Sequence, residues 1–401
     1  MPAAAAALTM AGRAHVDERP VYLDNAATTA VDPRVAAAMA ECLTEEGVYG
    51  NPSSSTHRHG REAARRVETA RHEVAALIGA APDCIVFTSG ATEASNLALL
   101  GTARANADRR RHLVSARTEH RATLDPLRQL GREGFTTSWV DTDEAGRVTP
   151  AALRAALRPD TLLVSLMHVN NETGAVQDIA AFGALCREAG VLFHCDLAQA
   201  VGKLPTTGAA AWVDFGSFTA HKIHGPKGIG ALYVSPAARP WLRPIMFGGG
   251  QERGLRSGTL PTHQIAGFGR ACALAAAEGA ADAARMAALR AALWEALRQL
   301  PGVLLNGPAE GGSPAILNLS FEGIEGESLV TALTDVAVST GSACSSASGE
   351  PSYVLHALGR DTGLAQSSLR FSLGRYTSRR DVERAADAVC RAVTRLRSVA
   401  P

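Results

Sequence analysis

The sequence predicts an α/β fold, with a large domain built on a mostly parallel sheet and a smaller α+β domain after it. Short, continuously apolar runs alternate with amphipathic or alanine-rich runs from about residue 20 to 235. This alternation is typical of a parallel sheet that helices cover on both faces. Beyond about residue 262 a long helical run and shorter mixed elements replace it.

The strand candidates of the large domain are short runs rich in apolar and β-branched residues. They span residues 84–88, 112–116, 136–140, 162–167, 191–195, 215–219 and 230–234. Helical periodicity between them predicts helices over residues 60–77, 92–101 and 179–189. Strands and helices therefore alternate along most of this part of the chain.

The glycine-rich run 247–250 ends the alternation. A long Ala/Leu/Arg helix is expected over about residues 263–300, then a strand near 316–319, a helix from Gly326 and a closing helix after Ser378. We therefore expect a large domain over residues 21–262 and a small C-terminal domain over 263–401. Residues 1–20, alanine-rich and without a targeting pattern, are expected to form an extension that packs on the small domain.

Composition excludes several classes of protein. The 401 residues are 46% hydrophobic and carry a net charge of +1, which disfavours disorder and gives no long-range field for nucleic acid or an anionic membrane. No apolar run is long enough to predict a membrane span. Seven cysteines without a C-x-x-C pair disfavour a disulfide framework and a structural metal site, and they favour a cytoplasmic setting.

Polar residues follow four of the predicted strands, at the sheet edge where ligands of open parallel sheets bind. Lys222 follows the strand 215–219 and precedes a Gly/Pro loop. A lysine held there near other cations can have a lowered pKa and form a Schiff base. Lys227, its competitor, lies inside the Gly/Pro turn and is interpreted as a solvated residue.

The other three strand ends each allow a structural and a functional reading. The Ser-Gly-Ala-Thr turn 89–92 is either a plain helix cap or an anion site at a helix N-terminus. His120 is either a hydrogen-bonded structural histidine or a ring that stacks on a cofactor and moves protons. Asp196 is either a helix cap or the partner of a protonated pyridine nitrogen.

The combination decides between these readings. A phosphate turn, a ring-stacking histidine, a pyridine-pairing aspartate and a Schiff-base lysine occur in that order on successive strand ends. Pyridoxal 5′-phosphate (PLP) needs this set of partners, since its protonated ring nitrogen makes it an electron sink. The sequence therefore predicts a PLP enzyme with the cofactor on Lys222.

Several longer stretches of the sequence resemble the NifS-like cysteine desulfurases of the class V aminotransferase group, especially the branch that serves housekeeping iron–sulfur assembly. The stretches are 22–29 (YLDNAATT), 87–93 (FTSGATE), 167–172 (MHVNNE), 221–222 (HK), 256–259 (RSGT), 342–344 (SAC) and 370–375 (RFSLGR). The likeness runs from about residue 20 to 395. It implies PLP fold type I and a homodimer with active sites at the subunit interface.

The resemblance also implies roles for individual residues. Lys222 would carry the cofactor, Asp196 would pair with its ring nitrogen, and His120 would stack on the ring. The other implied cofactor contacts are Ala91, Thr92, Asn171, Gln199, Thr219, His221 and, from the partner subunit, Thr259. Arg370 and Asn171 would bind the substrate, because a guanidinium suits a planar carboxylate.

Cys344 is the expected nucleophile and sulfur carrier. It lies in the small, polar, periodless run 339–349, which predicts a mobile loop, whereas the other six cysteines sit in helical or strand patterns. An exposed cysteine without a function is the alternative on position alone. With the resemblance, the prediction is that L-cysteine becomes L-alanine while a persulfide forms on Cys344.

The chain departs from the family pattern in three places. Thr219-Ala220 stands where Ser-Gly is usual, and His224 stands where tyrosine is common. The chain ends at Pro401 without the longer polar tail that docks an iron–sulfur scaffold, so the acceptor protein stays open. A selenocysteine lyase, or a dedicated sulfur donor for a specialised thio-product pathway, is the alternative function. A catalytically silent scaffold that keeps the fold is a third, and the filled catalytic positions argue against it.

Overall fold

The computed structural model describes residues 19–340 and 351–399. Its main sheet has seven strands in the order β2-β8-β7-β6-β5-β3-β4. The strands are β2 (Ile85–Thr88), β3 (His112–Ala116), β4 (Thr136–Val140), β5 (Thr161–Ser165), β6 (Leu192–Asp196), β7 (Phe215–Thr219) and β8 (Gly230–Val234). Strand β8 runs antiparallel to both of its neighbours, and the other pairs are parallel.

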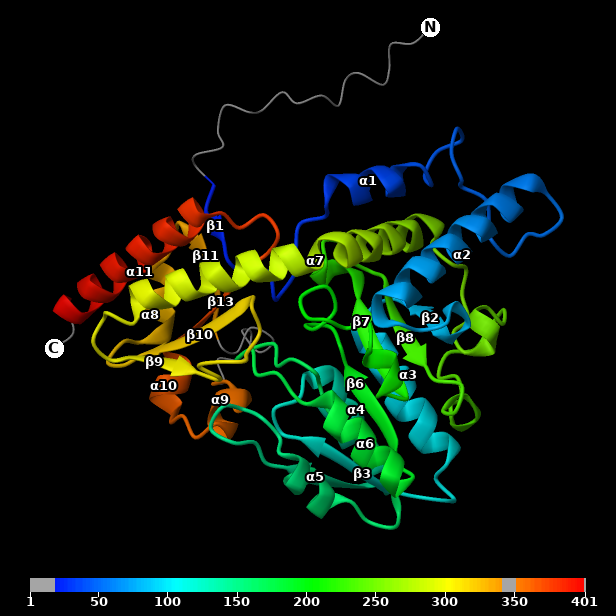
Figure 1. Ribbon diagram of the computed structural model, residues 1–401, viewed down its shortest axis with the longest axis horizontal. Helices are drawn as coiled ribbons and strands as arrows, with labels where there is room; N and C mark the ends of the chain where they lie inside the picture. The colour runs from blue at the N-terminus through cyan, green and yellow to red at the C-terminus, as the bar shows by residue number, and fades with distance from the viewer. Residues whose placement is uncertain (1–18, 341–350, 400–401) are drawn as a thin grey trace, which may run out of the picture.

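Helices cover both faces of this sheet (Figure 1). They are α2 (Arg58–Ile78), α3 (Ala91–Ala105), α4 (Arg121–Arg132), α5 (Pro150–Ala156) and α6 (Ile179–Ala189). Because successive side chains of a strand point to opposite faces, Phe87 packs in the cluster with α2 and α6, while Val86 packs in the cluster with α3 and α4. Both faces of the strands are buried except in the edge strand β4, which explains the mostly apolar sequences of the others.

The second unit is an antiparallel sheet with helices around it. Its order is β12-β13-β10-β9. The strands are β9 (Val303–Asn306), β10 (Ile316–Phe321), β12 (Ser339–Thr340) and β13 (Ser368–Ser372), and the helices are α8 (Gly326–Ala332), α9 (Tyr353–Ala357), α10 (Thr362–Gln366) and α11 (Arg379–Val399). Near the start of the described chain, β1 (Val21–Tyr22) pairs with β11 (Val336–Ala337), and Val21 and Leu23 pack in this unit's core.

The long helix α7 (Thr262–Leu297) runs along both units (Figure 1). Its first half supplies Ile265 and Phe268 to the core of the large sheet, and its second half supplies Met286 and Leu293 to the core of the small one. A domain boundary after residue 262 therefore stays a prediction. So does the packing of residues 1–20, because residues 1–18 lie outside the described residues.

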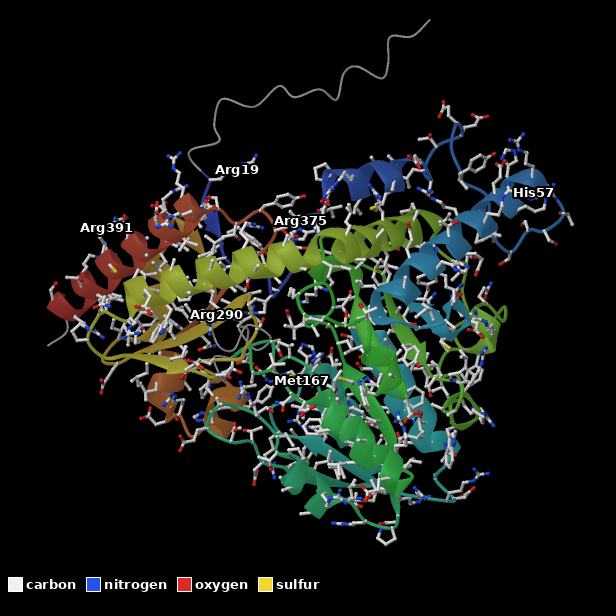
Figure 2. The ribbon with its side chains drawn as sticks, viewed as in Figure 1. Arg19, His57, Met167, Arg290, Arg375 and Arg391 are labelled. Carbon is white, nitrogen blue, oxygen red and sulfur yellow. The ribbon has the colours of Figure 1, made fainter. Side chains whose placement is uncertain are left out.

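Ion pairs hold the two units together next to α7. Arg375, which follows β13, is labelled in Figure 2. Its Nε lies 2.7 Å from Asp282 on α7, and its Nη1 lies 3.0 Å from Asp32. Asp32 caps the helix α1 (Pro33–Ala40) by accepting a hydrogen bond from the backbone N–H of Arg34. The segment before α1, which lines the site described below, is thereby fixed to both units.

The fold class predicted from the sequence is confirmed. Strands β3, β4, β7, β8 and the helix α6 coincide with the predicted ranges, and the remaining predicted elements begin or end within a few residues of them. Strand β5 is shorter than expected, because Leu166 and Met167 already belong to the loop that enters the site. Among the described residues, no helix is both long and apolar enough to cross a membrane.

Candidate active site

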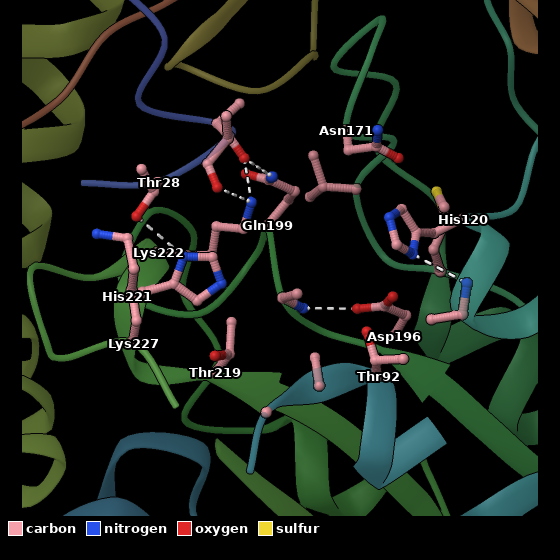
Figure 3. A pocket seen from close by; sticks show the side chains of 18 of the residues that line it. Thr28, Thr92, His120, Asn171, Asp196, Gln199, Thr219, His221, Lys222 and Lys227 are labelled. Atoms are coloured by element: carbon pink, nitrogen blue, oxygen red, sulfur yellow. Dashed lines mark hydrogen bonds between the residues drawn. The ribbon is translucent and has the colours of Figure 1, made fainter. Parts of the chain in front are cut away.

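A cavity of about 540 Å³ lies at the carboxyl ends of the large sheet's parallel strands (Figure 3). The loops after β2, β3, β5, β6 and β7 line it, together with the segment after β1 and Arg370 from β13. Parallel strands place their carboxyl ends at one sheet edge, so residues far apart in sequence meet there. The second unit closes the cavity through Arg370.

Lys222 ends a 3₁₀ turn, Ala220–Lys222, that follows β7 directly. Its Nζ donates to the carbonyl of Ala27 at 2.7 Å and also to that of Ala26. The turn is fixed from the same side, since Thr29 donates to the carbonyl of His221 through both N–H and Oγ1 at 2.9 Å. The amine is thus held by uncharged groups at the wall of the cavity. Lys227 is exposed, as expected of a turn residue, but it also lines the cavity.

Asp196 is the last residue of β6 and is buried at the cavity wall. Its Oδ1 accepts a hydrogen bond from the N–H of Ala198 at 2.8 Å, which closes a turn after β6. The helix-cap reading of Asp196 is wrong, because residues 198–203 form turns and not a helix. Within the described residues, Oδ2 accepts none. Burial raises the pKa of this carboxyl, while the charges of His120 and Lys222 oppose that rise. A buried carboxylate with one unused oxygen fits a cationic ring nitrogen.

His120 is the N-cap of α4 and lies half-buried across the cavity from Lys222 (Figure 3). Its Nδ1 accepts a hydrogen bond from the N–H of Ala122 at 3.1 Å, which fixes the ring and assigns the proton of the neutral imidazole to Nε2. The structural reading of His120 is therefore correct. It is compatible with the functional one, because the cap uses only one ring nitrogen.

An anion cradle lies where β2 passes into α3. The N-cap residue of α3 is Gly90, and no side chain caps the helix, so its first N–H groups face the cavity beside Ala91 and Thr92. His221 lines the same region, and burial, followed by the nearby Lys222, lowers its pKa to about 4. Thr219 keeps its hydroxyl in the cavity wall and donates it to the carbonyl of Ile229 at 3.1 Å.

Arg370 enters the cavity from β13 and is 3% exposed. Its Nη2 pairs with Asp24 Oδ1 at 2.8 Å, and its Nη1 donates to the carbonyl of Asn171 at 2.9 Å. Its Nε is buried and has no partner in the described part of the chain. Its Nη2 also donates to Ser339 Oγ at 3.2 Å. Three partners therefore orient the guanidinium at the cavity wall, where a planar anionic group suits it.

Comparison with known proteins identifies the family to which this chain belongs. The model of the class-V aminotransferases matches residues 21–385. The chain belongs to the class-V aminotransferase family. It is 52% identical to the cysteine desulfurase IscS of Pectobacterium atrosepticum and 54% identical to that of Pseudomonas entomophila, in each case over 382 residues that cover 95% of both chains.

Solved structures agree with this class-V assignment. A NifS-like protein superposes with a TM-score of 0.87 at 36% identity, covering 94% of this chain and 100% of that one. DndA from Streptomyces lividans superposes with a TM-score of 0.75 at 40% identity, covering 88% and 99%. The resemblance to NifS-like proteins and the prediction of PLP fold type I are confirmed.

Class-V aminotransferases of this kind depend on PLP, and the site fits that cofactor. The fit rests on the unused oxygen of Asp196, the uncapped N-terminus of α3 and the amine of Lys222, which all border one cavity. PLP carries a basic ring nitrogen, a phosphate and an aldehyde, and the three features complement these groups in that order.

The structure brings together most of the residues that the sequence singled out. Those that line the cavity are Ala91, Thr92, His120, Asn171, Asp196, Gln199, Thr219, His221, Lys222 and Arg370. Thr259 does not line it and is exposed on this chain. Cys344 lies outside the described residues. Of the six other cysteines, five are buried and Cys390 is partly buried, as their sequence patterns predicted.

Sequence reasoning assigned no role to the segment after β1. Its carbonyls at Ala26 and Ala27 hold Lys222, its Thr28 hydroxyl lies 3.1 Å from His221 Nδ1, and Asp24 pairs with Arg370. The signal was present, since these residues belong to the run YLDNAATT. Their roles depend on contacts with residues about 200 and 350 positions away, which a local pattern does not encode.

Proposed function

We propose that the protein is a PLP-dependent cysteine desulfurase. In this proposal it converts L-cysteine to L-alanine, forms a persulfide on Cys344 and passes the sulfur to an acceptor protein for iron–sulfur cluster or thio-cofactor biosynthesis. The observation that carries the proposal is the identity of 52–54% over 95% of the chain to proteins named cysteine desulfurase IscS. A cavity with a lysine, a buried carboxylate and a buried arginine supports it.

Each part of the cofactor has a candidate partner. The N-terminus of α3 with Ala91 and Thr92, together with Thr219 and His221, would hold the phosphate, and Asp196 would pair with the ring nitrogen. His120 would stack on the ring, with Asn171 and Gln199 at the ring hydroxyl and the substrate region. Bound PLP supplies an electron sink that stabilises negative charge next to the substrate amine.

The residues of the chain bind the substrate and move its protons. Arg370 would bind the substrate carboxylate, since its guanidinium is already oriented by Asp24 and Asn171. Lys222 Nζ is the base that takes the proton from the substrate Cα. His120 Nε2 assists, because its other ring nitrogen is engaged by Ala122 and the ring keeps one orientation.

Cys344 completes the reaction in this proposal. Its thiolate attacks the substrate sulfur, an S–S bond forms as the substrate C–S bond breaks, and the carbon takes a proton to leave as alanine. The sum of cysteine and the Cys344 thiol equals alanine and the Cys344 persulfide, so no oxidant or reductant is needed. The small, polar residues around Cys344 in the sequence favour this role.

The test uses C344S. We expect this variant to keep the visible absorption band of the bound cofactor, near about 420 nm as for PLP on a lysine, and to lose alanine formation from cysteine. Full desulfuration by C344S would remove Cys344 from the mechanism. A wild-type protein that stays colourless with added PLP would instead favour a silent scaffold.

A homodimer is part of the proposal. Thr259 is implied as a phosphate contact by the family resemblance, yet it is exposed and outside the cavity of its own chain. A contribution from the partner subunit reconciles these two facts. The cytoplasm is the proposed location, because the cysteines of the sequence form no disulfide or zinc pattern.

A further inference from the structure

The chain contains very few lysines. Of its 40 basic residues only three are lysines, namely Lys203, Lys222 and Lys227, and the rest are arginines. Lys222 and Lys227 line the main cavity. Lys203 and Lys222 both line a second, smaller cavity of about 20 Å³. A chain that uses arginine almost everywhere else therefore keeps all its lysines around one site.

Lys203 is buried in an environment that disfavours a cation. It is 7% exposed, and no carboxylate pairs with it among the described residues. Asp282 borders the same small cavity, but its Oδ2 is already engaged by Arg375 Nε at 2.7 Å. Burial and then the charges of Lys222 and Arg370 lower the pKa of Lys203 to about 7.

The remaining charged or titratable neighbours of Lys203 add no anion. His224 lines the same small cavity, and His221 and His224 each have a pKa lowered by burial and, in part, by the charge of Lys203. Arginine cannot lose its proton in a protein, whereas lysine can. The identity of residue 203 is thus explained by the need for a hydrogen-bond donor that need not stay charged.

Lys203 contacts Gln199, four residues earlier in the turns that follow β6. Lys203 Nζ donates to Gln199 Oε1 at 2.8 Å, and Gln199 Nε2 donates to the carbonyl of Ala26 at 2.8 Å. A backbone carbonyl only accepts hydrogen bonds, so the NH₂ group of Gln199 has to face Ala26 and its oxygen has to face Lys203. The two contacts together fix which way the amide points.

This orientation leaves a donor at the cavity. The NH₂ group of Gln199 carries two hydrogens, and Ala26 uses one of them. Gln199 lines the main cavity, beside Lys222 (Figure 3), whose amine donates to the same carbonyl of Ala26. Lys203 itself does not border the main cavity, so it acts on the site through Gln199.

We propose that Lys203 is a positioning residue that locks the Gln199 amide, so that one N–H of Gln199 stays available to an acceptor oxygen of the bound cofactor. The inference rests on the proposed function, in which Gln199 contacts the ring hydroxyl. Without the amine, Gln199 Oε1 would be buried without a donor, and the amide would turn to find one.

The test measures the dissociation constant of PLP from the visible absorption band during reconstitution of the cofactor-free chain. K203M removes the donor at similar volume, and we expect PLP to bind about 3- to 10-fold more weakly, the effect of one buried hydrogen bond. K203Q keeps an N–H donor and should bind PLP within about twofold of wild type. K203L gives a second apolar replacement should K203M not fold.

A matched control lies three residues further along the chain. Thr206 is buried, its Oγ1 donates to the carbonyl of Leu77 at 3.2 Å, and it does not line either cavity. T206V therefore removes one buried hydrogen bond three residues from Lys203 without touching Gln199. We expect T206V to lower thermal stability to a similar extent as K203M and to leave the dissociation constant of PLP unchanged.

A double-mutant cycle shows whether Lys203 acts through Gln199. We expect K203M to weaken PLP binding in the wild-type background and to have no further effect in the Q199A background. Equal PLP binding by wild type and K203M, or the same loss in both backgrounds, would overturn the inference. Failure of the wild-type chain to take up PLP would instead overturn the proposed function.

Discussion

The most direct stability prediction concerns the ion pair between Arg71 on α2 and Glu252. Both oxygens of Glu252 accept hydrogen bonds from the guanidinium at 2.7 and 2.8 Å, and the two side chains are 4% and 1% exposed. The pair also covers the free edge of β2, one of the two edge strands of the large sheet. Arg71 Nη1 donates to the carbonyl of Ile85, and the N–H of Phe87 donates to Glu252 Oε2.

E252A would remove the buried counter-charge of Arg71, leaving only the exposed Glu68 at 3.1 Å from its Nε, and would leave the Phe87 N–H without its acceptor. Breaking a buried pair on one side costs about 3–5 kcal/mol. An unfolding entropy of about 2.1 cal/mol/K per residue gives roughly 0.8 kcal/mol/K for this chain. The thermal midpoint should therefore fall by about 4–6 °C.

Thermal unfolding of the cofactor-loaded protein, followed by circular dichroism, measures this fall. The control is E295A, which breaks the exposed pair of Glu295 and Arg298, with side chains 61% and 51% exposed. Exposed helical pairs contribute about 0.3–0.5 kcal/mol, so this midpoint should move by less than about 1 °C. If E252A shifted the midpoint no more than E295A, the reasoning about the buried edge of β2 would be refuted.

Three further predictions concern the site. Burial raises the pKa of Glu172 to about 7, above its unfolded value of 4.5, so its stabilising contribution is complete below pH 4.5 and is lost as pH rises through 7. Wild type should lose up to about 3 kcal/mol relative to E172Q over that window, and parallel thermal midpoints of the two proteins at pH 5 and 8 would contradict this. R370K cannot keep the contacts to both Asp24 and Asn171, so the KM for cysteine should rise about 10- to 100-fold while the cofactor band stays; an unchanged KM would exclude Arg370 from carboxylate binding. D196N removes the negative charge beside the ring nitrogen and should slow alanine formation at least about 100-fold, and a wild-type rate in this variant would exclude the assigned role of Asp196.

The sequence was a good guide wherever a local pattern suffices. Strands such as β3 and β7 are buried on both faces, so their apolar runs have clear ends, and the polar residues that follow them were found directly. Asp196 and His120 were ambiguous between capping and cofactor binding. The structure shows that His120 caps α4 through Nδ1, whereas Asp196 holds a turn through Oδ1 and, among the described residues, leaves Oδ2 unused at the cavity.

The sequence did not predict the partners that hold these residues in place. Asp24 forms an ion pair with Arg370 of the other unit. The carbonyl of Ala26 accepts hydrogen bonds from Lys222 and Gln199. Lys203 donates to the side-chain oxygen of Gln199. None of these pairings follows from propensity or periodicity, because each joins a loop to a residue that the fold brings near. The only sequence feature that distinguishes Lys203 is the scarcity of lysine in the chain.

The sequence by itself determined the fold class, the order of the strands and helices, and most of the residues that line the cavity, because burial on both faces of a sheet and the polar strand ends restrict residue types locally. The tertiary structure decided how those residues are oriented. It brings the segment after β1 into contact with Lys222. It also pairs Arg370 with Asp24 and places the amine of Lys203 at the side-chain oxygen of Gln199. These orientations depend on contacts between segments that are distant in the chain. The free energy of such contacts comes from packing and burial and not from neighbouring residues in the chain.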